Sequence, residues 1–181
     1  GGIFNDSNST STISNSTFSA NSAVTLGGGL FNQKTNGIVG IVTLTNSTLS
    51  GNSARSNANS VISSGGIYND GTLNIANTII ANSTSGGDFS GNQPVTSTNN
   101  LITIGTLTGA TPVTSAQLNL GPLQNNGGTT STMALGAGSV AIGKGNATIS
   151  NSSPVNGLDQ RGLTRSSTAP SIGAYEYLPS I

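Results

Sequence analysis

Gly2-Ile3-Phe4-Asn5 is the stretch that decides the fold, because the same phrase returns as Gly29-Leu30-Phe31-Asn32 and Gly66-Ile67-Tyr68-Asn69. A second phrase follows each copy, and its asparagines Asn15, Asn46 and Asn77 recur every 31 residues. A fixed period in this range is typical of a solenoid, in which each unit buries its apolar face only by stacking on the next. The repeat therefore predicts a stacked fold and favours a scaffold over a catalyst.

The composition is unusually neutral and polar. Charged residues make up 6% of the 181 residues and the net charge is zero, while Asn, Ser, Thr and Gly together account for 101 positions. An average soluble protein is about 25% charged. A neutral surface provides no electrostatic attraction for nucleic acid or anionic lipid, so we expect no nucleic-acid partner. With no cysteine, the chain has neither disulfides nor thiolate metal ligands.

Short alternating segments indicate β-strands. Residues 42–45 and 72–75 alternate with period two, and the glycine clusters at 27–29, 65–66 and 86–87 punctuate them as turns. A strand-turn unit of about 27–37 residues cannot close its own core, but coiling successive units in parallel register solves this. The fold class predicted is all-β: a right-handed parallel β-helix, or β-solenoid, of four to six turns.

Equivalent residues of a solenoid stack in rows along its axis. We expect Ile3, Leu30 and Ile67 to form an aliphatic row, Phe4, Phe31 and Tyr68 an aromatic row, and Asn15, Asn46 and Asn77 an inward asparagine ladder. A second asparagine row is expected at Asn21, Asn52 and Asn82, although the last phrase is one residue shorter. Residues 33–40 and 55–64 are predicted to be loops outside the core.

The chain divides into two regions packed as one continuous domain. Residues 1–105 carry the repeats, whereas residues 106–181 contain most of the prolines and lose the period. Proline donates no ladder hydrogen bond. Residues 106–181 are therefore predicted to form final irregular turns and a C-terminal cap, because a solenoid's last turn otherwise exposes an edge.

Two sets of phrases carry a family resemblance. The repeats Gly-Gly-Ile-Tyr-Asn and Leu-Thr-Asn-Ser-Thr-Leu-Ser-Gly-Asn resemble those of polymorphic outer-membrane-protein-like, pectin-lyase-like β-helices. Residues 120–128, 134–142, 159–162, 165 and 172–177 resemble the C-terminal module of bacterial choice-of-anchor Q proteins, with Met133 and Gly143 where that family usually has His and Asp. The resemblance implies a secreted or cell-surface bacterial β-helix.

The charged residues do not form an evident catalytic set. The chain has no histidine and five acidic residues, so nucleophilic catalysis with a histidine base is excluded. Asp6 and Asp70 follow equivalent repeat asparagines, but Gln33 holds the intervening position, and turn capping is the favoured interpretation. We expect no enzyme activity, no metal and no cofactor.

Four charges are concentrated near the C-terminus: Asp159, Arg161, Arg165 and Glu176. They could form a sugar-binding or acid-base cluster, but we favour ion pairs that hold the cap, since arginine can bind a carboxylate with two parallel hydrogen bonds.

Seven Asn-x-Ser/Thr motifs occur, a number that the composition alone explains. Asn8, Asn146 and Asn151 are the candidate exposed glycosylation sites among them.

Three functions remain open at this point. The expected one is a non-enzymatic extracellular structural protein that stacks head-to-tail with other copies of itself into a surface filament, because Gly1 lies within a repeat phrase. The alternatives are a stalk or passenger of a bacterial surface adhesin, covered by upstream repeats of the same precursor, and, less favoured, a protein that binds or cleaves polysaccharide. Glycans are candidate partners, and no direct membrane span is expected.

Overall fold

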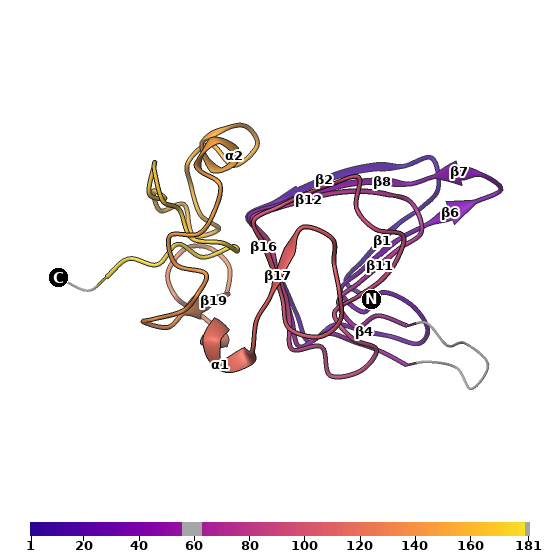
Figure 1. The fold of residues 1–181 in the computed structure, drawn as a ribbon, viewed down its shortest axis with the longest axis horizontal. Helices are drawn as coiled ribbons and strands as arrows, with labels where there is room; N and C mark the ends of the chain where they lie inside the picture. The colour runs from indigo at the N-terminus through magenta and orange to yellow at the C-terminus, as the bar shows by residue number, and fades with distance from the viewer. Residues whose placement is uncertain (56–62, 180–181) are drawn as a thin grey trace.

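A computed structural model describes residues 1–55 and 63–179 and has the architecture of a parallel β-solenoid. Four rungs and the start of a fifth stack along one axis. Figure 1 looks nearly along this axis, so that equivalent strands of successive rungs overlie one another. The all-β, parallel architecture predicted from the repeat period is confirmed.

Three parallel sheets make up the walls of the coil. Sheet A contains β1 (Ile3–Asn5), β5 (Leu30–Asn32), β11 (Ile67–Asn69) and β14 (Phe89–Gly91). Sheet B contains β2 (Thr10–Ser14), β8 (Ile41–Thr45), β12 (Thr72–Ala76) and β15 (Thr96–Thr98). Sheet C contains β3 (Thr17–Ser19), β9 (Thr48–Ser50), β13 (Ile79–Ala81), β16 (Asn100–Ile102) and β17 (Ala110–Pro112). A short pair, β4 (Ser22–Ala23) and β10 (Ser53–Ala54), continues the first two rungs.

The strands pair in the register that the repeats predict. Leu30 lies between Ile3 and Ile67, and Phe31 lies between Phe4 and Tyr68. The aliphatic row points into the coil, where Leu30 and Ile67 are fully buried together with inward residues of the other two sheets. At the first rung, Ile3, Ile13 and Phe18 pack against this core but are only partly buried.

Glycine is required where the chain turns toward sheet A. A Cβ atom on Gly28 would collide with the carbonyl oxygens of Ser53 and Gly65. Because two rungs of backbone approach this closely, no larger residue fits there without a shift.

The predicted loop at 33–40 is an antiparallel hairpin outside the core. It consists of β6 (Lys34–Thr35) and β7 (Ile38–Val39), joined by Asn36 and Gly37, which both have positive φ. Two consecutive positive φ values are typical of the type I′ turn that suits a two-residue hairpin loop. The loop predicted at 55–64 lies mostly outside the described residues.

A short segment closes the end of the coil that follows the fourth rung. Leu107 turns into the central core with only 5% of its surface exposed, and Ala110 packs beside it. β17 then pairs with β16 as the start of a fifth rung. Leu107 and Ala110 thus cover the central core at this axial end of the coil.

The remaining C-terminal residues lie beside the solenoid. This lateral segment, residues 113–179, contains α1 (Ser115–Leu118), β18 (Leu120–Gln124), β19 (Thr132–Leu135) and α2 (Ala147–Asn151). Figure 1 shows it packed against the corner where sheets B and C meet, rather than over the end of the coil.

A second apolar core fastens the lateral segment to the outer face of sheet C. Ile79 and Leu101 point outward from this sheet and pack with Leu118, Leu135 and Ile172. Sheet C is thus buried on both faces, which explains why all residues of β9, β13 and β16 are buried. The two regions share one continuous structure through this sheet.

Candidate functional site

A buried asparagine ladder runs along the corner between sheets A and B. The Nδ2 group of Asn5 donates to Oδ1 of Asn32 at 2.8 Å, and Nδ2 of Asn32 donates to Oδ1 of Asn69 at 2.8 Å. Nδ2 of Asn69 continues the row to the carbonyl oxygen of Asn92. Each amide satisfies its neighbour, so a polar row can be buried without unpaired donors. These residues end the first phrase of the repeat, whereas the sequence predicts the ladder on the second phrase.

Asn15, Asn46 and Asn77 form a row with a different role. All three have positive φ, near 46–49°, as the turn between sheets B and C requires. Asn46 and Asn77 are fully buried and linked to each other as a ladder requires, but the row faces the lateral segment instead of pointing into the coil, which corrects the predicted direction. Asn46 and Asn77 both donate to Oγ of Ser150, and Asn77 also donates to Asn46 at 3.3 Å. These amides are the docking contacts of the lateral segment.

The second predicted asparagine row is shorter than expected. Asn21 donates twice to Oδ1 of Asn52, through its backbone N–H at 2.9 Å and its side chain at 3.1 Å. Asn82 instead has positive φ, as does Gly51, and Ser115 donates to its side-chain oxygen. Because the third copy of the second phrase is one residue shorter, Asn82 lies at the turn position that Gly51 holds in the second copy, and not at the position of Asn21 and Asn52.

The aromatic row lies on the outer face of sheet A. The ring centroids of Phe4 and Phe31 are 5.3 Å apart, and those of Phe31 and Tyr68 are 5.5 Å apart in an edge-to-face arrangement. Burial and the neighbouring Asp70 carboxylate raise the pKa of Tyr68 above its ordinary value. Phe4 is 58% exposed because it is the first member of the row.

The first ion pair of the predicted cluster joins Asp159 to Arg161. Two guanidinium nitrogens of Arg161 donate to Oδ2 of Asp159 at 2.9 and 2.7 Å, and the guanidinium lies 3.7 Å from the ring centroid of Tyr175. Backbone N–H groups of Arg161, Leu163 and Glu176 also donate to Asp159. This carboxylate therefore organises the end of the lateral segment.

The second ion pair joins Arg165 to Glu176 and reaches the solenoid. Arg165 lies 3.5 Å from Oε2 of Glu176, donates to the carbonyl oxygens of Leu158, Ser171 and Gly173, and donates to Oδ1 of Asn15 at 3.0 Å. Burial lowers the pKa of the Arg165 guanidinium, while the Glu176 carboxylate opposes this shift. The four charged residues thus lie together, and their polar atoms are engaged within the protein in an arrangement that can fasten the lateral segment.

A further aspartate has a structural role that the sequence did not reveal. Asp88 is fully buried, and its carboxylate accepts hydrogen bonds from the backbone N–H groups of Ser83, Thr103 and Ile104 and from the Thr103 hydroxyl. It bridges the turns of the third and fourth rungs. The only sequence signal is its position after Gly86-Gly87, which resembles an ordinary polar turn.

Asp6 and Asp70 lie two rungs apart, as the register of Asn5, Asn32 and Asn69 requires. The rung spacing separates them by about 9–10 Å along the axis. Oδ1 of Asp6 accepts a hydrogen bond from the backbone N–H of Ser7 in its own turn. The turn-capping interpretation therefore describes the geometry of Asp6.

The candidate glycosylation residues differ in accessibility. Asn8 and Asn151 are exposed, although Nδ2 of Asn151 donates to the Ser167 carbonyl oxygen. Asn146 is the N-cap of α2, where its Oδ1 accepts from the Ile149 N–H. A glycan on Asn146 would have to coexist with this cap, so Asn8 is the most accessible of the three.

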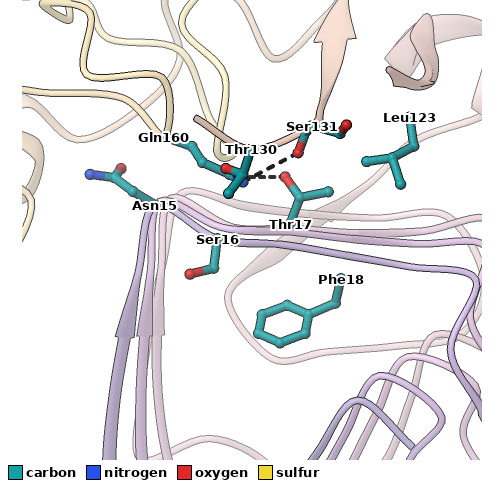
Figure 2. A pocket seen from close by; sticks show the side chains of 8 residues that line it. All are labelled: Asn15, Ser16, Thr17, Phe18, Leu123, Thr130, Ser131 and Gln160. Atoms are coloured by element: carbon teal, nitrogen blue, oxygen red, sulfur yellow. Dashed lines mark hydrogen bonds between the residues drawn. The ribbon is translucent and has the colours of Figure 1, made fainter. Parts of the chain in front are cut away.

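A groove of about 490 Å³ lies between the first rung and the lateral segment. It is lined by Asn15, Ser16, Thr17, Phe18, Leu123, Thr130, Ser131 and Gln160. Figure 2 shows Thr17 and Gln160 meeting across it, where the Thr17 hydroxyl lies 2.6 Å from Oε1 of Gln160. Nε2 of Gln160 donates to Oγ1 of Thr130 and to the Ser131 carbonyl oxygen. The groove is neutral and rich in hydroxyl and amide groups.

Comparison of the chain with protein-family models, curated proteins and solved structures found no match. Within residues 1–55 and 63–179, the two short helices are too short to cross a bilayer. Across the same described residues, no three acidic side chains are grouped so that they could hold a metal ion.

Proposed function

We propose that the chain is a non-enzymatic structural protein, secreted or displayed at a bacterial surface, in which the solenoid is a rigid stalk built by rung stacking. The neutral composition and the resemblance of the repeats to surface β-helices support this location. The internal engagement of the four clustered charges supports a structural rather than a chemical role for them.

One observation carries the choice of a stalk: the two axial ends differ. Leu107 and residues beside it close one end, whereas the first rung has half-buried Ile3, Ile13 and Phe18 at the other. A head-to-tail filament needs two complementary ends. A stalk needs only one stacking face, which rungs of the same repeat type can cover, whether they belong to the same polypeptide or to another.

Negative-stain microscopy and sedimentation of the native protein test this proposal. Short rods, together with release of the protein when native cells are treated with protease, are the expected result. Filaments with a short axial repeat would overturn the stalk in favour of head-to-tail assembly. Cleavage of pectin-like polymers that is lost in the Asp6→Asn variant would overturn the non-enzymatic assignment.

A further inference from the structure

The strand β3 has one edge that no described strand of the solenoid pairs with. In the second rung, Thr48 N–H donates to the Ser16 carbonyl oxygen, and the Ala20 N–H donates to Ser50, so Thr48 and Ser50 face the first rung. Thr17 and Ser19 are their register partners. Because hydrogen-bonding direction is shared by equivalent residues of a parallel ladder, the N–H and C=O groups of Thr17 and Ser19 face away from the second rung.

The groove of Figure 2 lies over this edge. Its lining includes Phe18, whose ring packs inside the solenoid, and Leu123, Thr130 and Ser131, which lie outside it on β18 and the approach to β19. The groove is lined by residues from both sides of β3, as expected for a groove at the edge of that strand. The β18–β19 hairpin therefore forms an outer wall beside the position of an added strand.

The residues that line the groove restrict which kind of segment can bind in it. Phe18 is half-buried and Leu123 is 47% exposed, so each offers apolar surface on one side of the slot. The rest of the lining is hydroxyl and amide groups without a charge. A charged segment would lose hydration there without an opposite charge to compensate, so the groove favours a neutral segment.

We propose that the free edge of β3 is a strand-addition site that takes an extended neutral segment of the chain's own repeat type, Asn-Ser-Thr-hydrophobic-Ser, in parallel register. This inference rests on the proposed stalk function and names the segment that its stacking face recognises. Main-chain hydrogen bonds to Thr17 and Ser19 supply affinity, and the side-chain pockets on either face supply specificity.

Continuity with the existing rung interface supports this occupant. Between the first and second rungs, Thr17 lies over Thr48 and Phe18 over Leu49. An added Asn-Ser-Thr-Leu-Ser segment would repeat this contact, with its leucine over Phe18 and its small threonine beneath Leu123. A large outward side chain would meet the hairpin wall, which distinguishes this edge from an open sheet edge.

Binding of a short peptide to the full chain tests the site. The probe is a fluorescent, end-blocked peptide Thr-Asn-Ser-Thr-Leu-Ser-Gly, the sequence of residues 45–51. We expect saturable binding that protects the Thr17 and Ser19 amides from hydrogen exchange. A matched peptide with aspartate in place of leucine should bind at least about tenfold more weakly, a difference of 1.4 kcal/mol.

Two variants and one control locate the binding. Ser19→Pro removes an N–H that faces the free edge, and Ser131→Trp fills the groove from an exposed wall position. Both should weaken peptide binding by about tenfold or more. Thr12→Pro makes the same backbone change at the free edge of β2, outside the groove, and should leave binding unchanged.

The proposal is overturned if the wild-type chain does not bind the peptide, if Thr12→Pro weakens binding as much as Ser19→Pro, or if Ser131→Trp has no effect. These outcomes are separate from those for the stalk. If the protein is released from cells as rods but does not bind the peptide, the stalk proposal stands and the strand-addition site is rejected. If the protein forms filaments or cleaves polysaccharide and still binds the peptide, the stalk proposal is rejected and the strand-addition site stands.

Discussion

The guanidinium of Arg165 donates a hydrogen bond across 3.0 Å to the side-chain oxygen of Asn15, a residue 150 positions earlier in the chain. This contact links the lateral segment to the first rung, while Asn46 and Asn77 bind Ser150 farther along the same corner. The asparagines at this turn thus have two roles: their positive φ lets the backbone turn between sheets B and C, and their side chains bind the lateral segment.

Replacement of Arg165 by methionine should destabilise the protein by about 3–5 kcal/mol, because the buried Glu176 carboxylate would lose its cationic partner. Denaturant unfolding measures this change. The double variant Arg165→Met with Glu176→Gln should recover part of the loss. No recovery would show that the hydrogen bonds to carbonyl oxygens and to Asn15, rather than the ion pair, dominate.

Replacement of Arg161 by alanine should have a smaller effect, about 2–3 kcal/mol, because Asp159 keeps its three backbone N–H donors. A lower melting temperature is the expected readout. Lys34→Ala removes an equal charge from the exposed hairpin and is the matched control, with an expected change within about 0.5 kcal/mol. Equal melting temperatures for Arg161→Ala and the wild type would contradict a fastening role.

The asparagine ladder predicts a strong effect for Asn32→Ala. The substitution leaves Nδ2 of Asn5 and Oδ1 of Asn69 without their partner in a fully buried row, which should cost about 2–4 kcal/mol. Gln33→Ala, one residue later, removes only an exposed hydrogen bond to Thr35 and should be nearly neutral. Similar urea midpoints for the two variants would argue against the ladder as a major source of stability.

The raised pKa of Tyr68 predicts a loss of stability at high pH. The folded state holds the phenolic proton more tightly than the unfolded state, so the contribution is complete below the ordinary tyrosine pKa of about 10 and is lost as pH rises through the folded value. Ultraviolet titration of the wild type and Tyr68→Phe should show that Tyr68 ionises above pH 10. Asp70→Asn should lower its pKa, and an unchanged titration curve would contradict the contribution of that carboxylate.

The stacked rows could be predicted from the sequence because they depend only on the period. Ile3, Leu30 and Ile67 occupy equivalent places in successive copies, and any coil that keeps the register must stack them. The ion-pair partners were also recognisable as a group, because few other charges exist and four of them lie close together in the sequence.

The direction of the Asn15, Asn46 and Asn77 side chains could not be predicted from the repeat. Their partners, Ser150 and Arg165, lie in a segment without the period, so nothing in the repeat indicates that this corner is covered. One signal was available: Ile79 and Ile80 are consecutive apolar residues in a strand, whereas Thr17-Phe18-Ser19 alternates. Two adjacent apolar residues indicate burial on both faces, as sheet C shows.

The closed end of the coil gives a last prediction, for Leu107. Truncation to alanine should leave a cavity against Ile102 at the end of the central core and cost about 2–4 kcal/mol. Ile104→Ala changes a 45% exposed neighbour and is the control.

Hydrogen exchange gives the more specific test of Leu107, because Val113 N–H donates to the Ile102 carbonyl oxygen at 2.9 Å and reports on the last paired strand. If Leu107 closes this end, exchange at Val113 should accelerate more than exchange in β9. Equal acceleration at Val113 and in β9 would mean that Leu107 supports the whole coil. No acceleration at Val113 would mean that Leu107 does not close this end, and the stalk proposal would lose the difference between the two ends on which it depends.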